Sequence, residues 1–307
     1  MTLGDPRGIG PEVVQRALAQ ERLDADITLI GPDDQIAEIP AQRRIGVGAW
    51  RSGSRARETR NGTGETAQAE SEAGRLAGRA VEEAVARARA GEVDAIATAP
   101  VHKHALHLAG YHYPGLTEFL SHLAGGADVA MMLATGSLRV VLVTTHLPLR
   151  DVPGQVTTER VIRIGRIAGR ALTEWWGIER PRLAVCALNP HAGDSGLFGD
   201  EDDWVLRPAA QALGAVGPLP ADTVFVRALQ GEFDAVLTPY HDVGMTAVKV
   251  AGFGKGVNVT LGLPFPRTAP DHGTALDIAG KGIADAGSMR AALELAVELA
   301  RRQLVRR

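Results

Sequence analysis

Three histidines follow apolar segments that are rich in β-branched residues, a composition typical of buried strands. They are His146 after residues 138–145, His191 after 183–188 and His241 after 235–239. Ligands bind at the carboxyl ends of strands in open α/β sheets, so we expect the three imidazoles at one edge of a sheet. Imidazole is a common ligand of divalent metals, and the pattern therefore predicts a metal site. Taken singly, each histidine is more often a capping or core-edge residue.

A lysine follows a further strand-like segment, residues 95–99. Lys103 comes four residues after this segment. Burial and a nearby cation both lower the pKa of an ammonium, so this lysine could exchange a proton with a substrate hydroxyl. The alternative is a solvated lysine at the start of a helix. Asp242, beside the expected metal ligand His241, is the second candidate for proton transfer.

Anion-binding side chains surround the predicted strand 256–260. Lys249, Asn258 and Arg267 combine a point charge, an amide and a planar guanidinium, the mixture that a phosphate or carboxylate needs. An exposed surface would explain the same residues. The glycine-rich run 252–256 precedes this strand, whereas a dinucleotide-binding fingerprint follows a strand and opens a helix, so we discount it.

Strand-like and helical segments alternate along the chain, which indicates an α/β fold. The predicted strands are 26–31, 95–99, 138–145, 183–188, 235–239 and 256–260. The predicted helices are 11–19, 65–90, 117–123, 157–175, 202–213 and 289 to the end. We also expect a surface loop over 51–64, and a first strand before Gly4 that is very short or missing.

Composition narrows the class of protein. The 307 residues are enough for two domains, and a net charge of −3 leaves no basic field for a nucleic acid. Cys186 is the only cysteine, which excludes an intrachain disulfide and fits a reducing compartment. The N-terminus lacks the layout of a signal peptide, and no apolar run approaches the roughly 18 residues of a membrane span. We therefore expect a cytoplasmic protein without membrane or nucleic-acid partners.

Four longer motifs resemble those of the 4-hydroxythreonine-4-phosphate dehydrogenase family. They are Thr-Thr-His-Leu-Pro-Leu-Arg-Asp at 144–151, Asn-Pro-His-Ala-Gly at 189–193, Pro-Tyr-His-Asp at 239–242, and Gly-Val-Asn-Val-Thr-Leu-Gly-Leu-Pro at 256–264, followed by Arg267 and Thr268. The likeness runs from Gly4 to about Met289. It implies an NAD- or NADP-dependent oxidoreductase of pyridoxal phosphate (vitamin B6) biosynthesis.

The resemblance also implies a fold, that of the isocitrate and isopropylmalate dehydrogenases. This is a two-domain α/β/α sandwich with the active site in the cleft between the domains. Residues 1–114 and 243–307 would form the cofactor-side domain with both termini, and 115–242 the second α/β domain, with the dimer contacts and metal ligands. The implied assembly is a homodimer whose active site takes groups from both subunits.

The family's site residues can be carried over motif by motif. The implied ligands of one divalent ion, with Zn, Mg, Co, Mn and Ni all open, are His146, His191 and His241. The positions that bind the phosphorylated substrate are occupied by Thr117, Lys249, Asn258 and Arg267, and Asp222 lies in another family motif. The segment 272–282 resembles the adenine-side cofactor loop of the larger group, which implies cofactor contacts for His272, Gly273, Thr274 and Asp277.

One departure from the family concerns Leu116, which stands where the family has the histidine of Gly-His-Thr-Glu. The implied reaction is oxidation of 4-hydroxythreonine 4-phosphate at C3, followed by decarboxylation to 3-amino-2-oxopropyl phosphate. Three alternatives stay open: a relative acting on 4-phosphothreonate or phosphoerythronate, one acting on a carboxylated aromatic cis-dihydrodiol, and a non-catalytic binding protein. The dihydrodiol would suit an apolar Leu116, whereas the retained Lys249, Asn258 and Arg267 favour a phosphate.

Overall fold

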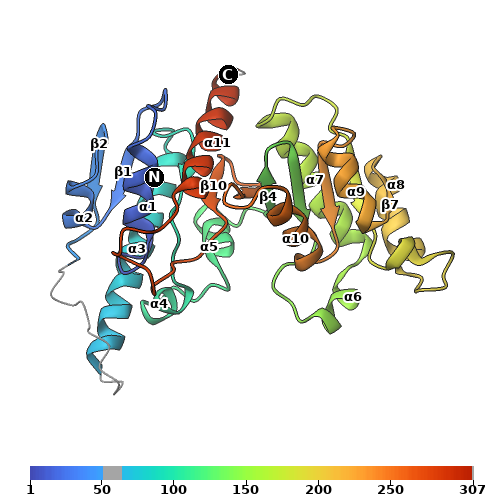
Figure 1. Cartoon of the computed structure of the whole chain (residues 1–307), viewed down its shortest axis with the longest axis horizontal. Coiled ribbons are helices and arrows are strands. Elements are labelled where there is room, and N and C mark those ends of the chain that lie inside the picture. Colours follow the sequence, from blue (N-terminus) through green and yellow to red (C-terminus); the bar gives the residue numbers. More distant parts are fainter. Residues whose placement is uncertain (51–63, 306–307) are drawn as a thin grey trace. The chain divides into compact units, whose positions relative to one another are not determined.

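The computed structural model describes residues 1–50 and 64–305, which form two compact α/β units (Figure 1). Unit 1 comprises 1–127 and 263–300, and unit 2 comprises 128–262 and the chain from Arg301 on. The predicted α/β class is therefore confirmed. Of the surface loop expected over 51–64, residues 51–63 lie outside the described residues, and Gly64 already begins a helix.

Unit 1 contains short parallel strands. They are β1 (Thr28–Gly31), β2 (Arg43–Gly46), β3 (Ile96–Ala97) and β10 (Arg267–Pro270). β1 pairs with β2, and β3 pairs with β10. Thr2 forms parallel bridges to Ile30 and Thr98, so a single residue takes the place of a strand between β1 and β3. The very short first strand expected from the sequence is thus confirmed.

The helices that lie in or begin in the described part of unit 1 are α1 (Gly10–Leu18), α2 (Asp33–Ala37), α3 (Gly64–Arg89), α4 (Lys103–Leu108), α5 (Leu116–Leu123) and α11 (Gly287–Leu304). α3 buries a stripe of small and aliphatic side chains at helical spacing, Ala73, Leu76, Ala77, Ala80, Val81, Ala84 and Val85. Gly74 lies against the backbone of Ala105, where a Cβ atom would clash. The small residues therefore allow α4 to approach α3 closely.

Unit 2 contains strands in the order β9-β4-β5-β8-β6-β7. Their bounds are β4 (Ala130–Thr135), β5 (Leu138–Leu142), β6 (Leu183–Cys186), β7 (Val216–Leu219), β8 (Ala235–Thr238) and β9 (Val257–Leu261). β5, β8, β6 and β7 run parallel, whereas β4 is antiparallel to both β5 and β9. The carboxyl ends of the four parallel strands therefore share one edge.

Helices and tight turns connect the strands of unit 2. They are η2 (Leu149–Asp151), α6 (Val152–Gln155), α7 (Thr158–Glu174), η3 (Pro190–Gly193), the π-helical η4 (Asp202–Leu206), α8 (Arg207–Leu213), α9 (Ala221–Leu229) and α10 (His241–Ala251). One core cluster joins β5, β6 and β8 to α9 and α10, and Val140, Ala184 and Val236 at its centre are fully buried.

The unit boundaries differ from the predicted domain boundaries at 114/115 and 242/243. α5 remains in unit 1, where it contacts α3. α10 and β9 remain in unit 2, because β9 pairs with β4 and α10 packs on β5. The chain therefore leaves unit 2 only after β9. Lys249 and Asn258 consequently lie in the same unit as the three histidines, whereas Arg267 lies in unit 1.

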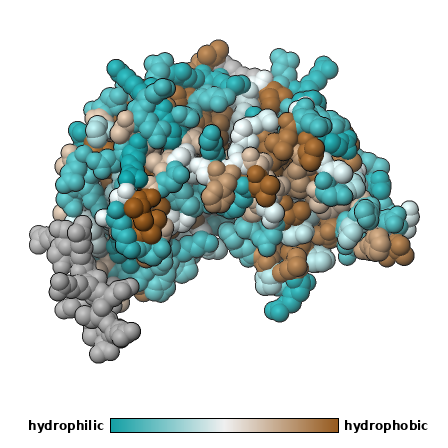
Figure 2. Space-filling model, in the orientation of Figure 1, coloured by the Kyte–Doolittle hydropathy of each residue, from teal (hydrophilic) through white to brown (hydrophobic). Residues whose placement is uncertain are grey.

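The surface mixes polar and apolar residues on the face drawn in Figure 2. Exposed apolar side chains in unit 2 include Leu149, Leu197, Phe198 and Trp204. No helix within 1–50 and 64–305 is long and apolar enough to cross a membrane.

Candidate functional site

Two of the three histidines are brought together at the carboxyl edge of unit 2. His146 follows β5, and His241 follows the neighbouring strand β8 and opens α10. Their ring centroids are 5.4 Å apart. Hydrogen bonds tie the two strand ends to each other, because Thr144 Oγ1 donates to the carbonyl of Pro239 over 2.7 Å. The expected convergence of strand ends thus holds for this pair.

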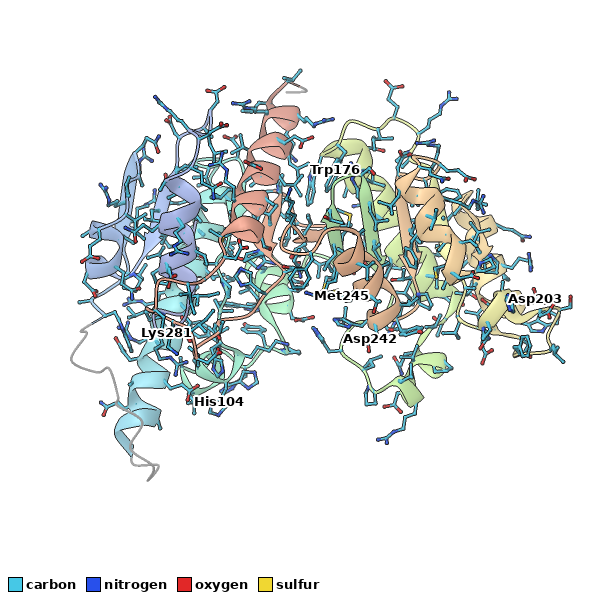
Figure 3. The ribbon with its side chains drawn as sticks, in the orientation of Figure 1. His104, Trp176, Asp203, Asp242, Met245 and Lys281 are labelled. Atoms are coloured by element: carbon cyan, nitrogen blue, oxygen red, sulfur yellow. The ribbon has the colours of Figure 1, made fainter. Side chains whose placement is uncertain are left out.

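The ring of His241 is oriented by its neighbour. Nδ1 of His241 lies 2.7 Å from Oδ1 of Asp242, whose side chain is otherwise exposed and is labelled in Figure 3. A carboxylate partner on one ring nitrogen leaves the other nitrogen as the metal-binding atom. Asp242 is therefore placed to orient the imidazole of His241.

His191 follows β6, the next parallel strand, on a turn of unusual backbone. Its φ of 54° lies in the left-handed region, and Ala192, Asp194 and Ser195 share positive φ values. Such strained residues persist where the surroundings fix them. The carboxylate of Asp202, which is fully buried, accepts hydrogen bonds from the backbone N–H groups of Leu188 and Asn189.

The donor set fits a divalent ion in type but does not form a closed site. Within the described residues, no three or more His, Cys, Asp or Glu side chains are grouped closely enough to hold a metal. The ring of His191 lies instead beside Phe198, with centroids 6.4 Å apart. Two neighbouring imidazoles, one of them oriented by Asp242, are therefore in place, and a third lies at the end of the adjoining strand.

The remaining candidates of unit 2 are spread over three elements. Asp222 is exposed in the first turn of α9, after β7, at the same carboxyl edge as the histidines. Lys249 is partly buried two turns along α10 from His241. Asn258 lies within β9, paired with Leu133, so it is level with the middle of the sheet. Oδ1 of Asn258 is buried without a hydrogen-bond partner in the described part of the chain.

Lys103 and Thr117 lie close together in unit 1. Lys103 is the exposed first residue of α4, and Thr117 lies in the first turn of α5. A Cβ atom built on Gly115, the residue before α5, would lie 3.9 Å from Cε of Lys103. The lysine side chain therefore reaches the turn that carries Leu116 and Thr117.

Arg267 begins β10 and is only 4% exposed. Its Nη2 atom donates to Oγ1 of Thr98 over 2.5 Å. Burial lowers the pKa of this guanidinium to about 10, so it is still charged near neutral pH. A buried cation is a strong anion partner, because water does not screen it.

The predicted cofactor loop is held by the N-terminal part of the chain. The N–H of Ile9 donates to the carbonyl of Thr274 over 2.9 Å, and Glu12 on α1 accepts from the N–H of Ala284 over 3.0 Å. Nε2 of His272 is buried without a hydrogen-bond partner among the described residues. Gly273 and Asp277 are exposed beside it. An orphaned ring nitrogen next to exposed positions fits a polar ligand such as a nucleotide base.

The chain matches one known protein family over most of its length. The profile of the family described as pyridoxal phosphate biosynthetic protein PdxA matches residues 11–296. The chain belongs to the PdxA family. This confirms the family indicated by the four sequence motifs.

Named PdxA relatives match nearly the whole chain. It is 42% identical to D-threonate 4-phosphate dehydrogenase of Salmonella typhimurium, covering 98% of both chains. It is 41% identical to 4-hydroxythreonine-4-phosphate dehydrogenase of Beijerinckia indica, covering 97% of this chain and 94% of the relative. The crystal structure of 4-hydroxythreonine-4-phosphate dehydrogenase from Klebsiella pneumoniae matches with a TM-score of 0.83 at 39% identity, over 97% of this chain and 98% of that one.

Sequence reasoning on this PdxA protein missed the residues that hold the candidate groups. Asp202 fixes the His191 turn, Thr98 contacts Arg267, and Glu70 lies against the residues that flank Lys103. Each acts across a large separation in the chain, and none lies in a recognisable motif. Only the fold reveals them.

Proposed function

We propose that this protein is an NAD(P)- and divalent-metal-dependent dehydrogenase of pyridoxal phosphate biosynthesis. Its substrate is 4-hydroxythreonine 4-phosphate, which is oxidised at C3 and decarboxylated to 3-amino-2-oxopropyl phosphate. The observation that carries the proposal is the His146–His241 pair with its orienting carboxylate Asp242, in a chain of the PdxA family. The dehydrogenase names of the curated relatives support it.

In this mechanism His146 and His241 hold the divalent ion, with His191 as the third ligand. When bound, the metal would supply positive charge beside a substrate oxygen, and NAD(P) would supply the hydride acceptor. Asp242 keeps Nδ1 of His241 engaged, so the ring presents Nε2. Zn, Mg, Co, Mn and Ni remain the candidates, since all accept nitrogen or mixed ligands to different degrees.

Proton transfer falls to Lys103. Its amine accepts the proton of the C3 hydroxyl while the C3–H bond breaks and its hydrogen leaves as hydride. After carbon dioxide has left, the same group returns a proton to C2. The exposed side chain beside Gly115 and the first turn of α5 supports this role. Asp242 is the weaker candidate, because its carboxylate is engaged with an imidazole.

The phosphate is bound by Arg267 and Lys249, with Asn258 and Thr117 as hydrogen-bonding groups and Asp222 near the substrate. The buried, charged guanidinium of Arg267 is the strongest support, because it combines charge with low solvent screening. The cofactor is bound by the loop with His272, Gly273, Thr274 and Asp277. The orphaned Nε2 of His272 supports that assignment.

A homodimer with a shared active site is part of the proposal. The described residues of one chain gather two histidines and not three, so a second copy can complete or reorganise the site. Mass measured by light scattering, with and without the metal, tests the assembly. We place the protein in the cytoplasm, as its composition indicates.

One assay tests the activity. The purified protein is mixed with NAD or NADP, a divalent metal and one of three substrates: 4-hydroxythreonine 4-phosphate, 4-phosphothreonate or a carboxylated aromatic cis-dihydrodiol. We expect reduced cofactor to form fastest with 4-hydroxythreonine 4-phosphate, and a chelator to abolish the reaction. No reduced cofactor with any of the three would favour the non-catalytic alternative.

4-Phosphothreonate is a second candidate substrate, and one observation favours it. Leu116, the first residue of α5 beside Thr117, cannot donate the hydrogen bond that a histidine would make. The two substrates differ at C2, where one carries an amine and the other a hydroxyl. The Salmonella typhimurium relative is named for D-threonate 4-phosphate, so both substrates belong in the assay.

A further inference from the structure

Glu70, on α3, lies at the centre of a charged cluster in unit 1. Its Oε1 atom is 3.0 Å from Nδ1 of His102, 3.3 Å from Nδ1 of His104 and 3.4 Å from Nη2 of Arg7. The Glu70 side chain is only 20% exposed. His102 and His104 are the two residues that flank Lys103, so one carboxylate contacts the chain on both sides of the lysine.

The cluster keeps Glu70 charged. Burial alone raises the pKa of the carboxyl, but His104, Arg7 and His102 outweigh it and hold the pKa of Glu70 below its usual range. The carboxylate is therefore negative at neutral pH. The contact with His102 is an ion-pair contact rather than a well-aligned hydrogen bond, whereas His104 is the stronger partner.

Arg7 is fixed from its other side, which makes the cluster rigid. Nε and Nη2 of Arg7 donate to the carboxylate of Asp5 over 3.0 and 2.8 Å, and Asp5 is 1% exposed. The N–H of Asp5 donates in turn to the carbonyl of Pro100 over 2.9 Å. Glu70 is thus tied through Arg7 and Asp5 to the segment that leads into α4, and directly to α4 through His104.

Lys103 itself stays outside this network. Its ammonium makes no ion pair or hydrogen bond within the described residues, and its side chain runs towards Gly115. Glu70, the carboxylate that contacts both of its neighbours, is already occupied by two imidazoles and a guanidinium. We propose that Glu70 is a positioning residue: it clamps His102 and His104, so the turn between them presents Lys103 in one geometry and leaves its amine available. This inference rests on the proposed function, in which Lys103 transfers the proton.

The first test is Glu70→Gln, which keeps the size of the side chain and removes its charge. We expect kcat to fall about tenfold with KM for substrate and cofactor nearly unchanged, because Lys103 is misplaced while binding groups are not. The matched control is Glu72→Gln on the same helix, since Glu72 pairs with Arg75 away from Lys103 and its loss should leave kcat unchanged. Equal kcat in Glu70→Gln and the parent, at an unchanged melting temperature, overturns the proposal.

A double-mutant cycle separates positioning from a general structural role. If Glu70 acts through Lys103, Glu70→Gln has no further effect on the residual turnover of Lys103→Ala. Additive losses of kcat show that Glu70 acts elsewhere and overturn the proposal. Full turnover in Lys103→Ala removes the lysine from the mechanism, and with it the positioning role.

A labelling experiment does not depend on turnover. Acetic anhydride modifies free amines, and mass spectrometry of the peptides reports the rate at Lys103 and at the exposed Lys255 of unit 2. We expect Glu70→Gln to speed labelling of Lys103 alone, because loss of the clamping carboxylate loosens the turn that presents its amine. Unchanged labelling of Lys103 contradicts the clamp. A protein that turns over none of the substrates refutes the proposed function, yet this readout still tests the clamp.

Discussion

The two candidate ligand-binding regions are built in opposite ways. In unit 1, Asp5, Arg7 and Glu70 form a continuous network beside Lys103, and the predicted cofactor loop is bonded to α1 and the turn before it. In unit 2, His146 and His191 are exposed, and His191 lies on a turn with left-handed backbone. The side chains of the unit 1 region are held by hydrogen bonds and ion pairs without a ligand. In the unit 2 region only His146 and His241 lie close together, and His191 lies apart from them.

One region is preorganised before binding, whereas the other would be ordered by the ligand that it binds. Preorganised groups lose little entropy on binding, so they suit proton transfer and anion recognition, which need fixed geometry. A metal site can be completed by the ion, since binding energy repays the ordering of its ligands. We therefore expect the unit 2 region to depend on a bound ion more than the unit 1 region depends on its ligands, and the following changes test that contrast.

The largest effect is expected from removing a histidine of unit 2. His146→Ala, His191→Ala and His241→Ala should each remain folded and lose nearly all turnover, by more than about 100-fold, because too few ligands remain to fix the ion. Metal content by mass spectrometry and kcat check this. His112→Ala, an exposed histidine of unit 1, is the control. Full activity in any one of the three variants after metal removal would contradict the proposed metal site.

Asp242→Ala tests the orienting carboxylate. We expect metal affinity to fall by about 10- to 100-fold, the usual cost of losing the partner of a ligating imidazole. Calorimetry with Zn²⁺ measures the change, and Asp222→Ala on the same sheet edge serves as the control. Unchanged metal affinity with reduced turnover would instead return Asp242 to the role of a proton-transfer group.

The anion-binding candidates Arg267 and Lys249 should show a purely substrate-linked effect. Arg267→Ala or Lys249→Ala removes a charge-assisted bond of about 1.5 to 3 kcal/mol, which raises KM for a phosphorylated substrate about 10- to 100-fold. Cofactor affinity should barely change. Arg267→Lys checks whether charge alone suffices at this buried position. If both alanine variants bind the phosphorylated substrate as tightly as the parent does, a carboxylated aromatic cis-dihydrodiol becomes the favoured substrate.

Leu116→His probes the position where this chain departs from its family. In an enzyme for 4-hydroxythreonine 4-phosphate, the new donor beside Thr117 should improve kcat/KM by up to about tenfold, the value of one recovered hydrogen bond. Toward a less polar substrate that packs on Leu116, the buried imidazole should lower activity. Kinetics of both proteins with both substrates give opposite signs, and a variant that is worse with 4-hydroxythreonine 4-phosphate counts against it as the substrate.

The sequence predicts the strands that carry the histidines but misses β4 and β10. β5, β6 and β8 are short apolar runs bounded by turns, so their period and composition identify them. β10 begins with a buried arginine and ends in proline, and β4 is a run of alanine, methionine and leucine that equally suits a helix. Neither has a local signal, because pairing with neighbouring strands decides their structure.

The candidate site is predictable only as far as motifs reach. The histidines could be found because each follows a strand, and the edge they share follows from parallel pairing. Asp202 and Glu70 could not be found, because their partners lie far away in the sequence and contact depends on helix packing. The same reason explains why the sequence does not reveal that residues 243–262 belong to unit 2, since the pairing of β9 with β4 is a long-range contact.

The smallest effect is expected at the opposite end of the unit 2 sheet, where Asp234 and Arg182 precede β8 and β6. The backbone N–H of Arg182 donates to Oδ2 of Asp234 over 2.7 Å, and its Nε and Nη2 atoms donate to the two carboxylate oxygens over 3.1 and 2.9 Å. Burial raises the pKa of Asp234, but these bonds outweigh it and hold the pKa below its ordinary value of 3.8.

A carboxyl whose pKa is lower in the folded state stabilises the fold above its ordinary pKa, and this contribution is lost as pH falls through the folded value. Asp234→Asn should therefore lower the melting temperature at about pH 7, and the gap to the parent should shrink at about pH 3. Scanning calorimetry at the two pH values measures it. Zinc affinity and kcat near neutral pH should stay unchanged, because this pair fixes the amino ends of the strands and the histidines occupy the carboxyl ends. A variant that loses metal affinity as well as stability would show that the two ends of the sheet are coupled. We do not expect such coupling, because the hydrogen bonds of Asp234 and those at the histidine end form separate networks.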